Sequence, residues 1–592
     1  MSQQVSGRRR RREDEFSPGE LFANGEQGAW YDPSDFATLY QDSAGTTPVT
    51  ALGQPVGLML DKSQGGKPTQ ELVTNGDFSN GTTGWTATNA TVTVSDGVAT
   101  IVDNTGTGTF ETSITTVAGR TYRITYTTSA TREAYVYALD STRSVILSGP
   151  GATGTRTGTF SFVFVARDAT SILLINDGSN SALTVKISAV SIREIPGNHA
   201  AQGTAAAMPY VQARVNLLER TEEIDVSPWS TASAATIPTN NGLAPDGTLT
   251  ADTLQANGGD TLGRVQIAVP FTGDGEKCIA VYARAGTSTS SRFILRDNTL
   301  GVNRHDIFVT WTAGVPTLST NAGAGTLYAL ESFANGWYRI KFSATNIIAA
   351  NQNLLQLYAD RVLGTGNVIL WGAQAEDAAI PTTYQRVTTA TDYADIGLPR
   401  YLEFDGVDDA MATQSVDFTG TDEMTVSAGV SSDNNSTQFI AEISANAASN
   451  NGTFGLWRAS LIHNWRSKGT VDSFISGAST NSTSPLVLTG RGDISNDFAE
   501  LQRDGVQDAS GSGDQGTGNY GNYSLYIGAR AGTSFELKGR IHQLIIRGAT
   551  TAGNLLDQTE RFVARKTGVA ELAPYRQGSF SWDSSTSSPG AA

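Results

Sequence analysis

Residues 121–126 read Thr-Tyr-Arg-Ile-Thr-Tyr, so apolar and polar side chains alternate one by one along this stretch. The same alternation returns at residues 160–164 and at residues 185–187. A period of two places every second side chain on the same face of a β-strand. Glycine, proline and asparagine separate these runs, as at residues 149–151 and 177–180. The pattern predicts that residues 71–194 form a two-sheet β-sandwich with one apolar face per strand.

The rest of the chain extends this prediction to several modules. With 592 residues and about 150 residues per domain, about four units are expected. A second β-rich module follows from Val211 to Thr389 and a third from Tyr401 to Gly548. Modules one and two share a plan, because each opens with an asparagine soon followed by a tryptophan (Asn75 and Trp85, Asn216 and Trp229). This predicts a duplicated jelly roll.

The predicted fold class is therefore all-β and multidomain, with two jelly-roll sandwiches, a third sandwich and one short C-terminal helix. The amphipathic stretch from Asn554 to Ala570 supplies that helix. The expected divisions are an Arg-rich arm (1–21), a short segment (22–66), jelly roll one (67–196), a linker (197–210), jelly roll two (211–392), the third sandwich (393–550), and the helix with its tail (551–592).

Charge and composition exclude several classes of protein. Lys and Arg number 41 against 57 Asp and Glu, a formal net charge of −16, so nucleic-acid binding by the body of the chain is disfavoured. No run of about 18 apolar residues occurs, so neither a membrane span nor a Sec-type signal is expected. Cys278 is the single cysteine, which excludes an intrachain disulfide.

The N-terminal arm departs from this acidic composition. It holds five consecutive arginines, Arg8, Arg9, Arg10, Arg11 and Arg12. A segment with so little apolar surface is expected to be disordered when free. It is either a solvated tail or an anchor that orders on an acidic surface of a partner protein.

Several stretches resemble parts of bacteriophage virion proteins. Residues 211–218 (Val-Gln-Ala-Arg-Val-Asn-Leu-Leu), 245–254, 337–339 (Trp-Tyr-Arg) and 370–376 (Leu-Trp-Gly-Ala-Gln-Ala-Glu) resemble the carbohydrate-binding-like jelly rolls of phage tail proteins. Residues 71–85 look like the opening of galactose-binding-like carbohydrate modules. The resemblance implies that both modules are carbohydrate-binding-like.

The third module is similar to another family. Residues 402–409 (Leu-Glu-Phe-Asp-Gly-Val-Asp-Asp), with Arg503-Asp504-Gly505 and residues 527–541, resemble concanavalin-like, laminin-G-type sandwiches. In phage proteins of that type, segments like Trp30 to Asp35 and Asp61-Lys62-Ser63 precede the sandwich. The resemblance implies that residues 22–66 pack against residues 396–550, with both jelly rolls inserted between them. An independent virion anchor is the alternative for residues 22–66.

These resemblances imply a function. The expected protein is a bacteriophage virion protein, a tail fibre or similar appendage, assembled in the host cytoplasm and binding bacterial surface polysaccharide for adsorption. Its partners would be that polysaccharide and other virion proteins, with a homo-oligomer left open. The alternatives are a capsid or tail decoration protein that contacts only virion subunits, and a glycan depolymerase.

Aromatic side chains are the natural candidates for sugar binding, since a ring can lie against the apolar face of a pyranose. Trp229, Tyr520 and Tyr523 fall in expected turns or loops and should be exposed. If residues 454–465 form one continuous strand, Trp457, His463 and Trp465 share one face of it. That face is either core or groove, with core favoured because large aromatic residues usually supply core area.

Catalysis has little support. Glu403, Asp405 and Asp408 approach the Glu-x-Asp-x-x-Glu strand of some glycoside hydrolases, but the last position is Asp, so a strand leading into an Asp-Gly turn is favoured. The four histidines are scattered, without metal-ligand spacing. No enzyme, catalytic residue or cofactor is predicted. A structural calcium, for which Asn75-Gly76-Asp77 is the kind of turn involved, is left open with no ligand assigned.

Overall fold

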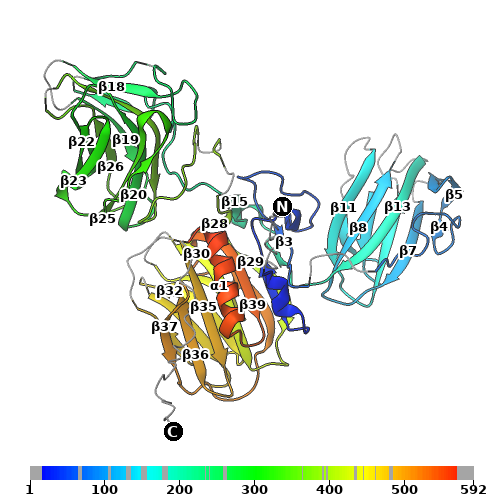
Figure 1. The fold of residues 1–592 in the computed structure, drawn as a ribbon. Coiled ribbons are helices and arrows are strands. Elements are labelled where there is room, and N and C mark those ends of the chain that lie inside the picture. Colours follow the sequence, from blue (N-terminus) through cyan, green and yellow to red (C-terminus); the bar gives the residue numbers. More distant parts are fainter. Residues whose placement is uncertain are drawn as a thin grey trace, which may run out of the picture.

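Six antiparallel sheets form three β-sandwiches, and these account for most of the chain (Figure 1). In this computed structural model, residues 16–569 are described except for 65–69, 105–107, 129–134, 149–156, 177–183, 234, 239, 258–262, 363, 390–391, 395–397, 433–435, 445, 448, 461 and 479–484. The predicted all-β class is confirmed. Residues 8–12 lie outside the described residues.

The first jelly roll has two five-stranded sheets around a core that contains Trp85, Tyr122 and Phe162. One sheet has the order β10 (Val145–Ser148), β9 (Tyr135–Leu139), β12 (Thr170–Asn176), β7 (Thr109–Thr115) and β4 (Thr86–Thr88). The other has the order β11 (Gly158–Val165), β8 (Thr121–Thr128), β13 (Thr184–Ile195), β6 (Val98–Asp103) and β5 (Ala90–Ser95). In β8, Tyr122, Ile124 and Tyr126 are buried as the alternation predicts.

The second jelly roll repeats this plan with longer strands. One sheet has the order β16 (Ser230–Ala232), β19 (Arg264–Val269), β26 (Asn353–Tyr358), β21 (Ser290–Asp297), β22 (Val302–Thr312) and β23 (Val315–Gly323). The other has the order β17 (Ala235–Thr236), β18 (Asp252–Ala256), β27 (Asn367–Glu376), β20 (Gly275–Ala285), β25 (Trp337–Ile347) and β24 (Glu331–Ser332). The short helix η4 (Ala334–Gly336) precedes β25.

The two jelly rolls have matching strand orders. When the strands of each sheet in the second jelly roll are taken in reverse order, they correspond to those of the first. In one sheet, the strands β22, β21, β26, β19 and β16 correspond to β10, β9, β12, β7 and β4. In the opposite sheets, β25, β20, β27, β18 and β17 correspond to β11, β8, β13, β6 and β5. β23 and β24 are the additions of the second jelly roll. This match agrees with the duplicated plan expected from the sequence.

The third sandwich is assembled from three separate stretches of chain. One sheet has the order β15 (Tyr210–Gln212), β28 (Tyr401–Asp405), β39 (Lys538–Arg547), β30 (Glu423–Ser432), β35 (Leu486–Asp493), β36 (Phe498–Arg503) and β37 (Val506–Gly511), and β1 (Gly28–Tyr31) pairs with β39. The other has the order β2 (Leu39–Tyr40), β3 (Leu58–Met59), β14 (Ala200–Ala201), β29 (Met411–Asp417), β38 (Asn522–Ile527), β31 (Gln438–Ile443), β32 (Thr453–Ala459), β33 (Ile462–Lys468) and β34 (Phe474–Ser476). The short helices η1 (Pro18–Phe22), η2 (Phe36–Thr38) and η3 (Ala205–Ala207) lie in its first two stretches.

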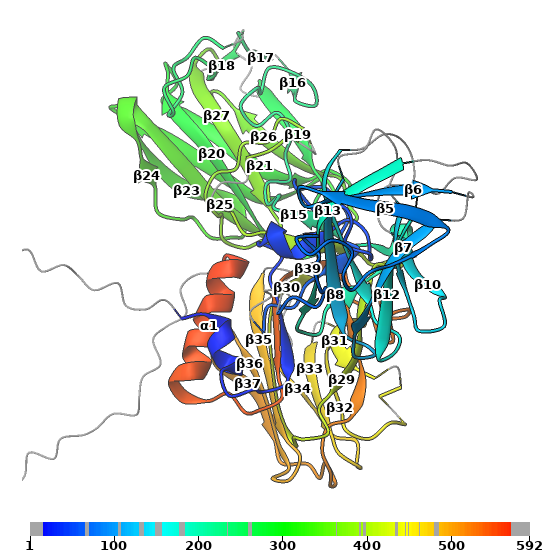
Figure 2. The ribbon, with the colours of Figure 1, turned by 90° about the vertical axis from the view of Figure 1, so that its right-hand side faces the viewer.

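The N-terminal segment belongs to this third sandwich. Gly28 to Tyr31 pair with Leu544 to Arg547 at the far end of the chain, and Tyr31 is fully buried in the common core (Figure 2). Of the two alternatives for residues 22–66, the structure therefore has the segment that completes the sandwich. Val211, where the second module was expected to begin, lies in β15 and pairs with Leu402 of the third sandwich.

Asp61 links the first two stretches of the third sandwich through hydrogen bonds. Its carboxylate accepts hydrogen bonds from the backbone N–H groups of Trp30 (2.8 Å), Asn198 (2.7 Å) and Ser63 (2.7 Å). Burial raises the pKa of this carboxyl to about 6, against the lowering effect of these bonds. Each jelly roll is thus an insertion into the third sandwich, the first between β3 and β14 and the second between β15 and β28.

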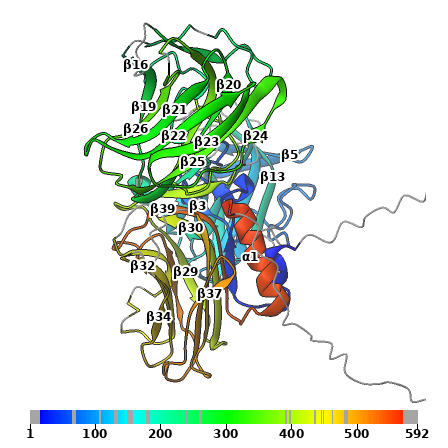
Figure 3. The ribbon, with the colours of Figure 1, turned by 60° about the vertical axis from the view of Figure 1, so that its left-hand side comes forward.

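One α-helix, α1 (Gly553–Thr567), covers the outer face of the sheet that contains β30, β35 and β39 (Figure 3). Val563 is buried against Val487 and Ile545, with Leu555 and Phe562 packed beside it, as the amphipathic pattern predicts. Over the described residues, no helix is both long and apolar enough to cross a membrane.

Candidate functional site

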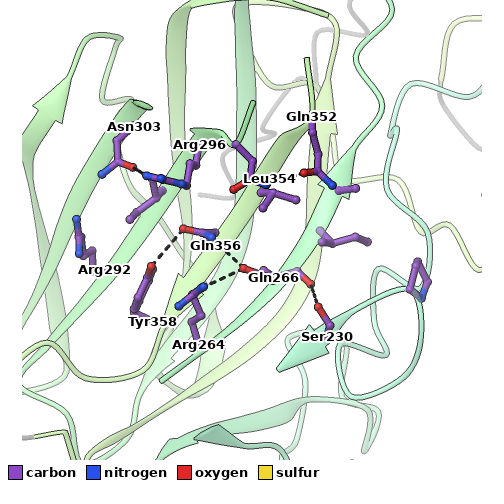
Figure 4. A pocket seen from close by; sticks show the side chains of 15 residues that line it. Ser230, Arg264, Gln266, Arg292, Arg296, Asn303, Gln352, Leu354, Gln356 and Tyr358 are labelled. Atoms are coloured by element: carbon purple, nitrogen blue, oxygen red, sulfur yellow. Dashed lines mark hydrogen bonds between the residues drawn. The ribbon is translucent and has the colours of Figure 1, made fainter. Parts of the chain in front are cut away.

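A groove of about 600 Å³ lies on the outer face of the second jelly roll, over β19, β26 and β21 (Figure 4). Its size falls within the range of about 300 to 1,000 Å³ usual for ligand sites. Side chains alternate between the two faces of each strand, so Val265, Ile267 and Leu355 point into the core while their neighbours along the strand line the groove, those of β26 as its buried floor. The groove surface is therefore set by alternate residues of three paired strands.

Strand pairing arranges these outward residues in three rows. The rows are Arg264, Tyr358 and Arg292; then Gln266, Gln356 and Ile294; then Ala268, Leu354 and Arg296. Because directly opposed side chains in an antiparallel pair lie close together, each row acts as one band of chemistry across the groove.

The first row is built around an aromatic ring. The guanidinium carbons of Arg264 and Arg292 lie 5.5 and 5.4 Å from the ring centroid of Tyr358. Cation–π contacts of this kind hold a guanidinium in place. The row therefore presents two positioned charges rather than one open ring face.

The second row is a network of amides. Gln356 Nε2 donates to Gln266 Oε1 (2.9 Å), and Arg264 Nε donates to the same oxygen (3.0 Å). Tyr358 donates its hydroxyl to Gln356 Oε1 (3.2 Å). At the edge of the groove, Ser230 Oγ lies 3.4 Å from the carbonyl of Gln266. Each amide carries both donors and acceptors, which is the chemistry that pairs with sugar hydroxyls.

The third row ends in a supported arginine. Arg296 Nη1 donates to Asn303 Oδ1 (2.8 Å), and Leu354 contributes an apolar surface beside it. Asn303 stands on β22, opposite Arg296, so the support comes from the neighbouring strand.

A buried carboxylate flanks the groove on the neighbouring strand β22, where Asp306 stands opposite Ile294. Asp306 accepts two hydrogen bonds from Arg292 (Nε to Oδ1 2.8 Å, Nη2 to Oδ2 2.6 Å) and one each from Asn303 and Asn321. Burial by itself would raise the pKa of Asp306, but the hydrogen bonds from Arg292 and the amides hold that pKa below its usual value. Asp306 is therefore ionised at neutral pH and fixes the position of Arg292.

Two aromatic residues expected to be exposed are buried. Trp229 is 5% exposed and lies in the core of the second jelly roll, where its Nε1 donates to the carbonyl of Arg220 (3.1 Å). Tyr520 is 1% exposed, and its hydroxyl lies 2.6 Å from Ser467 Oγ. The expected exposure was wrong because these loops fold back over the core and satisfy the polar tips internally.

Trp457 does not share a face with His463 and Trp465. Residues 454–465 form the hairpin strands β32 and β33 rather than one strand, so Trp457 points outward while Trp465 is fully buried in the core. His463 is also buried, and this desolvation lowers its pKa to about 3. The prediction of core is confirmed for Trp465.

Two candidates are partly exposed. Trp457 packs beside Phe439, with ring centroids 5.6 Å apart, on the outer face of the third sandwich. Tyr523 is half-buried and donates its hydroxyl to the carbonyl of Asn451 (3.1 Å). A role in glycan binding stays a prediction for both residues.

The groove residues were not predicted, because the candidates for sugar binding were chosen among aromatic side chains. Within residues 264–266, 292–296 and 354–358, the alternate positions between core residues hold Arg, Gln or Tyr except at Ile294 and Leu354. The alternation of polar residues can be seen in the sequence, but the sequence does not show which strands are neighbours. The polar positions form one surface only when their strands pair.

The acidic motifs lie in turns of this fold. β28 ends at Asp405, and Gly406 follows with a φ of +77°, as expected for an Asp-Gly turn. Among the described residues, the carboxylates of Asp405, Asp408 and Asp409 form a cluster in which they lie close enough together to hold a cation. Asp409 already accepts a hydrogen bond from the N–H of Asp405 (2.9 Å). At the opening of the first jelly roll, Asp77 accepts from Ser79 rather than standing in such a group.

No family model matches the sequence, and no curated protein matches it. Among solved structures, the chain is similar to the CBM40 module of the Ruminococcus gnavus IT-sialidase bound to α2,3-sialyllactose (12% identity, TM-score 0.21, 26% of this chain and 94% of that chain). It is also similar to a CBM4 structure (20% identity, TM-score 0.18, 21% of this chain and 99% of that chain). A third is the receptor-binding domain of botulinum neurotoxin D (9% identity, TM-score 0.22, 26% of this chain and 41% of that chain). Similarities this low assign no function to the chain.

Proposed function

We propose that the chain is a non-enzymatic glycan-binding protein and that the groove of the second jelly roll is its binding site. The observation that carries this proposal is the amide network of Gln266 and Gln356 in the floor of the groove, between positioned arginines. Such a surface offers many hydrogen bonds in a fixed geometry, which suits a ligand rich in hydroxyl groups.

The test is binding of the full chain to a panel of bacterial polysaccharides and their oligomers, measured by glycan array and calorimetry. Gln356→Ala removes the amide that joins the network, and we expect a loss of affinity of about tenfold, the equivalent of one hydrogen bond of about 1.4 kcal/mol. Ser510→Ala, at the edge of the third sandwich, is the control. Equal affinity of both variants for every bound glycan would rule out this groove as the site.

We further propose that the protein acts on the surface of a bacteriophage virion, in a tail fibre or similar appendage, and binds host polysaccharide during adsorption. The stretches at residues 211–218, 370–376 and 402–409 that resemble phage virion proteins support this proposal. Deleting residues 2–15 should then weaken incorporation into particles without changing glycan binding. Normal incorporation would mean that the arginine arm is a solvated tail.

The alternatives have separate outcomes. A decoration protein would be incorporated into particles but would bind no glycan on the array. A depolymerase would release new reducing ends from a polysaccharide that it binds, whereas a binding protein leaves the chain length unchanged.

A further inference from the structure

The groove of the second jelly roll concentrates positive charge in a chain whose formal net charge is −16. Arg264, Arg292 and Arg296 line it, and no Asp or Glu is among the described residues that do. Outside the groove lining, Arg361 stacks 3.5 Å from the ring centroid of Phe308, which stands opposite Arg292 on β22. Arginines gathered against the sign of the whole chain indicate selection for a ligand of opposite charge.

The positive charges are held differently from one another. Asp306, on the neighbouring strand β22, neutralises Arg292 from beside the groove. Arg296 is held instead by the amide oxygen of Asn303, a neutral partner, so this contact orients the guanidinium without cancelling its charge. An arginine fixed in this way is prepared for a bidentate contact with a planar anion.

The single aromatic ring of the groove is already engaged. Tyr358 lies between Arg264 and Arg292, and its hydroxyl donates to Gln356. Stacking on a sugar ring or a nucleic-acid base therefore contributes less here than charge and hydrogen bonds do.

We propose that this groove selects acidic glycans, with Arg296 contacting a carboxylate or sulfate group and Gln266 and Gln356 contacting hydroxyls. The inference rests on the proposed glycan-binding function and names the chemical class of its ligand. Single-stranded nucleic acid, the other common polyanion, fits less well, because it requires free aromatic platforms and a basic body.

The experiment compares four probes against the full chain: oligogalacturonate, the same oligomer with its carboxyl groups reduced to alcohols, sulfated dextran oligomers, and an oligothymidylate. At about 50 mM NaCl we expect oligogalacturonate to bind at least about tenfold more tightly than its reduced form. At about 0.5 M NaCl the ratio should shrink several-fold, because salt screens the charge and leaves the hydroxyl contacts. The sulfated arm shows whether the groove distinguishes the two anions.

Variants assign the effect to one side chain. Arg296→Gln should abolish most of the preference for the charged oligomer while keeping affinity for the reduced one. Arg296→Lys should retain part of the preference. Arg143→Gln removes the same charge from the first jelly roll and should change neither affinity. Thermal unfolding of each variant checks that the fold is intact.

Each result has one meaning. If no glycan binds, charged or neutral, the proposed function fails and this inference fails with it. If the charged and reduced oligomers bind equally, the glycan site stands and its selectivity for acids is wrong. Tighter binding of oligothymidylate than of every glycan would overturn the ligand class. Unchanged preference in Arg296→Gln would overturn the role of Arg296.

Discussion

The two jelly rolls have corresponding strand orders but expose opposite chemistry on corresponding sheets. On the second, the outward positions of β19, β26 and β21 carry Arg, Gln and Tyr, and Gln356 and Tyr358 form the floor of the groove with 3% and 6% of their surface exposed. On the first, the corresponding strands β7, β12 and β9 carry Leu139, Ile172 and Leu174 beside Tyr137, and the three aliphatic side chains are each less than 10% exposed. The same backbone plan therefore supports a polar groove in one copy and an apolar layer in the other.

The difference lies at the outward positions alone. In both copies the inward residues of these strands are apolar and buried, as with Leu173 and Ile175 in β12 and Leu355 and Leu357 in β26. Core burial requires the first set to be apolar, whereas the outward set is free to change without loss of the fold. Function in this architecture is therefore decided by alternate residues on one sheet of each copy.

The largest expected effect tests whether the two copies share a core plan. Trp85→Ala and Trp229→Ala each remove a buried ring, 8% and 5% exposed, from the opening of a jelly roll. Each change should lower the free energy of unfolding of its own unit by about 3–5 kcal/mol. Hydrogen exchange followed by mass spectrometry would locate the loss. Loss of protection in both jelly rolls from one substitution would show that the cores are coupled.

A second pair separates packing from recognition. Leu174 of β12 and Gln356 of β26 occupy the middle rows of the two faces, opposite Tyr137 and Ile294. Leu174→Ala should cost about 2 kcal/mol of stability and leave glycan affinity unchanged, because Leu174 lies in the other jelly roll and carries no polar group. Gln356→Ala should lower glycan affinity about tenfold and also cost about 1–3 kcal/mol of stability, because Gln356 is 3% exposed and its loss takes a hydrogen-bond partner from Gln266 and from Tyr358. The comparison breaks down if Leu174→Ala weakens binding as much as Gln356→Ala does.

Titration should also distinguish the copies. In the second jelly roll, burial raises the pKa of Asp252 to about 6 and that of Glu376 to about 7. The folded state then holds more protons than the unfolded state, so stability should fall as pH rises from about 4 to 6 for Asp252 and from about 4.5 to 7 for Glu376.

The first jelly roll should behave differently over the same interval. The pKa of Glu71 is lowered despite burial, by Ser191, backbone N–H groups and Arg193. Its stabilising contribution is present above about pH 4.5 and is lost as pH falls, so no decline is expected between pH 5 and 7. Hydrogen exchange in β20 and β13, corrected for intrinsic rates, measures both units. A decline that persists in Asp252→Asn with Glu376→Gln would have another origin.

The sequence could predict the sandwiches because their signal is local. The alternation at Tyr122, Ile124 and Tyr126 reports which side chains face a core, whatever strand lies beside them. The packing of Val563 under α1 follows from helical periodicity for the same reason. Both depend on the near neighbours in the chain.

The groove could not be predicted in this way because it depends on register. Arg264, Tyr358 and Arg292 are far apart in the sequence and form one row only through the pairing of β19, β26 and β21. Two of the aromatic candidates were expected to be exposed but are buried, since Trp229 and Tyr520 satisfy their polar atoms inside the cores. The sequence shows polar residues at alternate positions, but it does not show which strands pair to bring those residues together.

The smallest effect concerns the ion pairs of the two faces. In the first jelly roll, Arg143 binds Glu111 through two hydrogen bonds (2.9 and 2.6 Å), but its side chain is 52% exposed. Solvent and salt screen such a pair, so Arg143→Gln should cost less than about 1 kcal/mol, and less still at high salt. The Arg292–Asp306 pair beside the groove differs, because the Asp306 side chain is 1% exposed and would be left as a buried charge without Arg292. Urea unfolding of Arg143→Gln at low and high salt measures the first case. A cost well above 1 kcal/mol would mean that the face of the first jelly roll depends on its ion pair as strongly as the groove depends on its own.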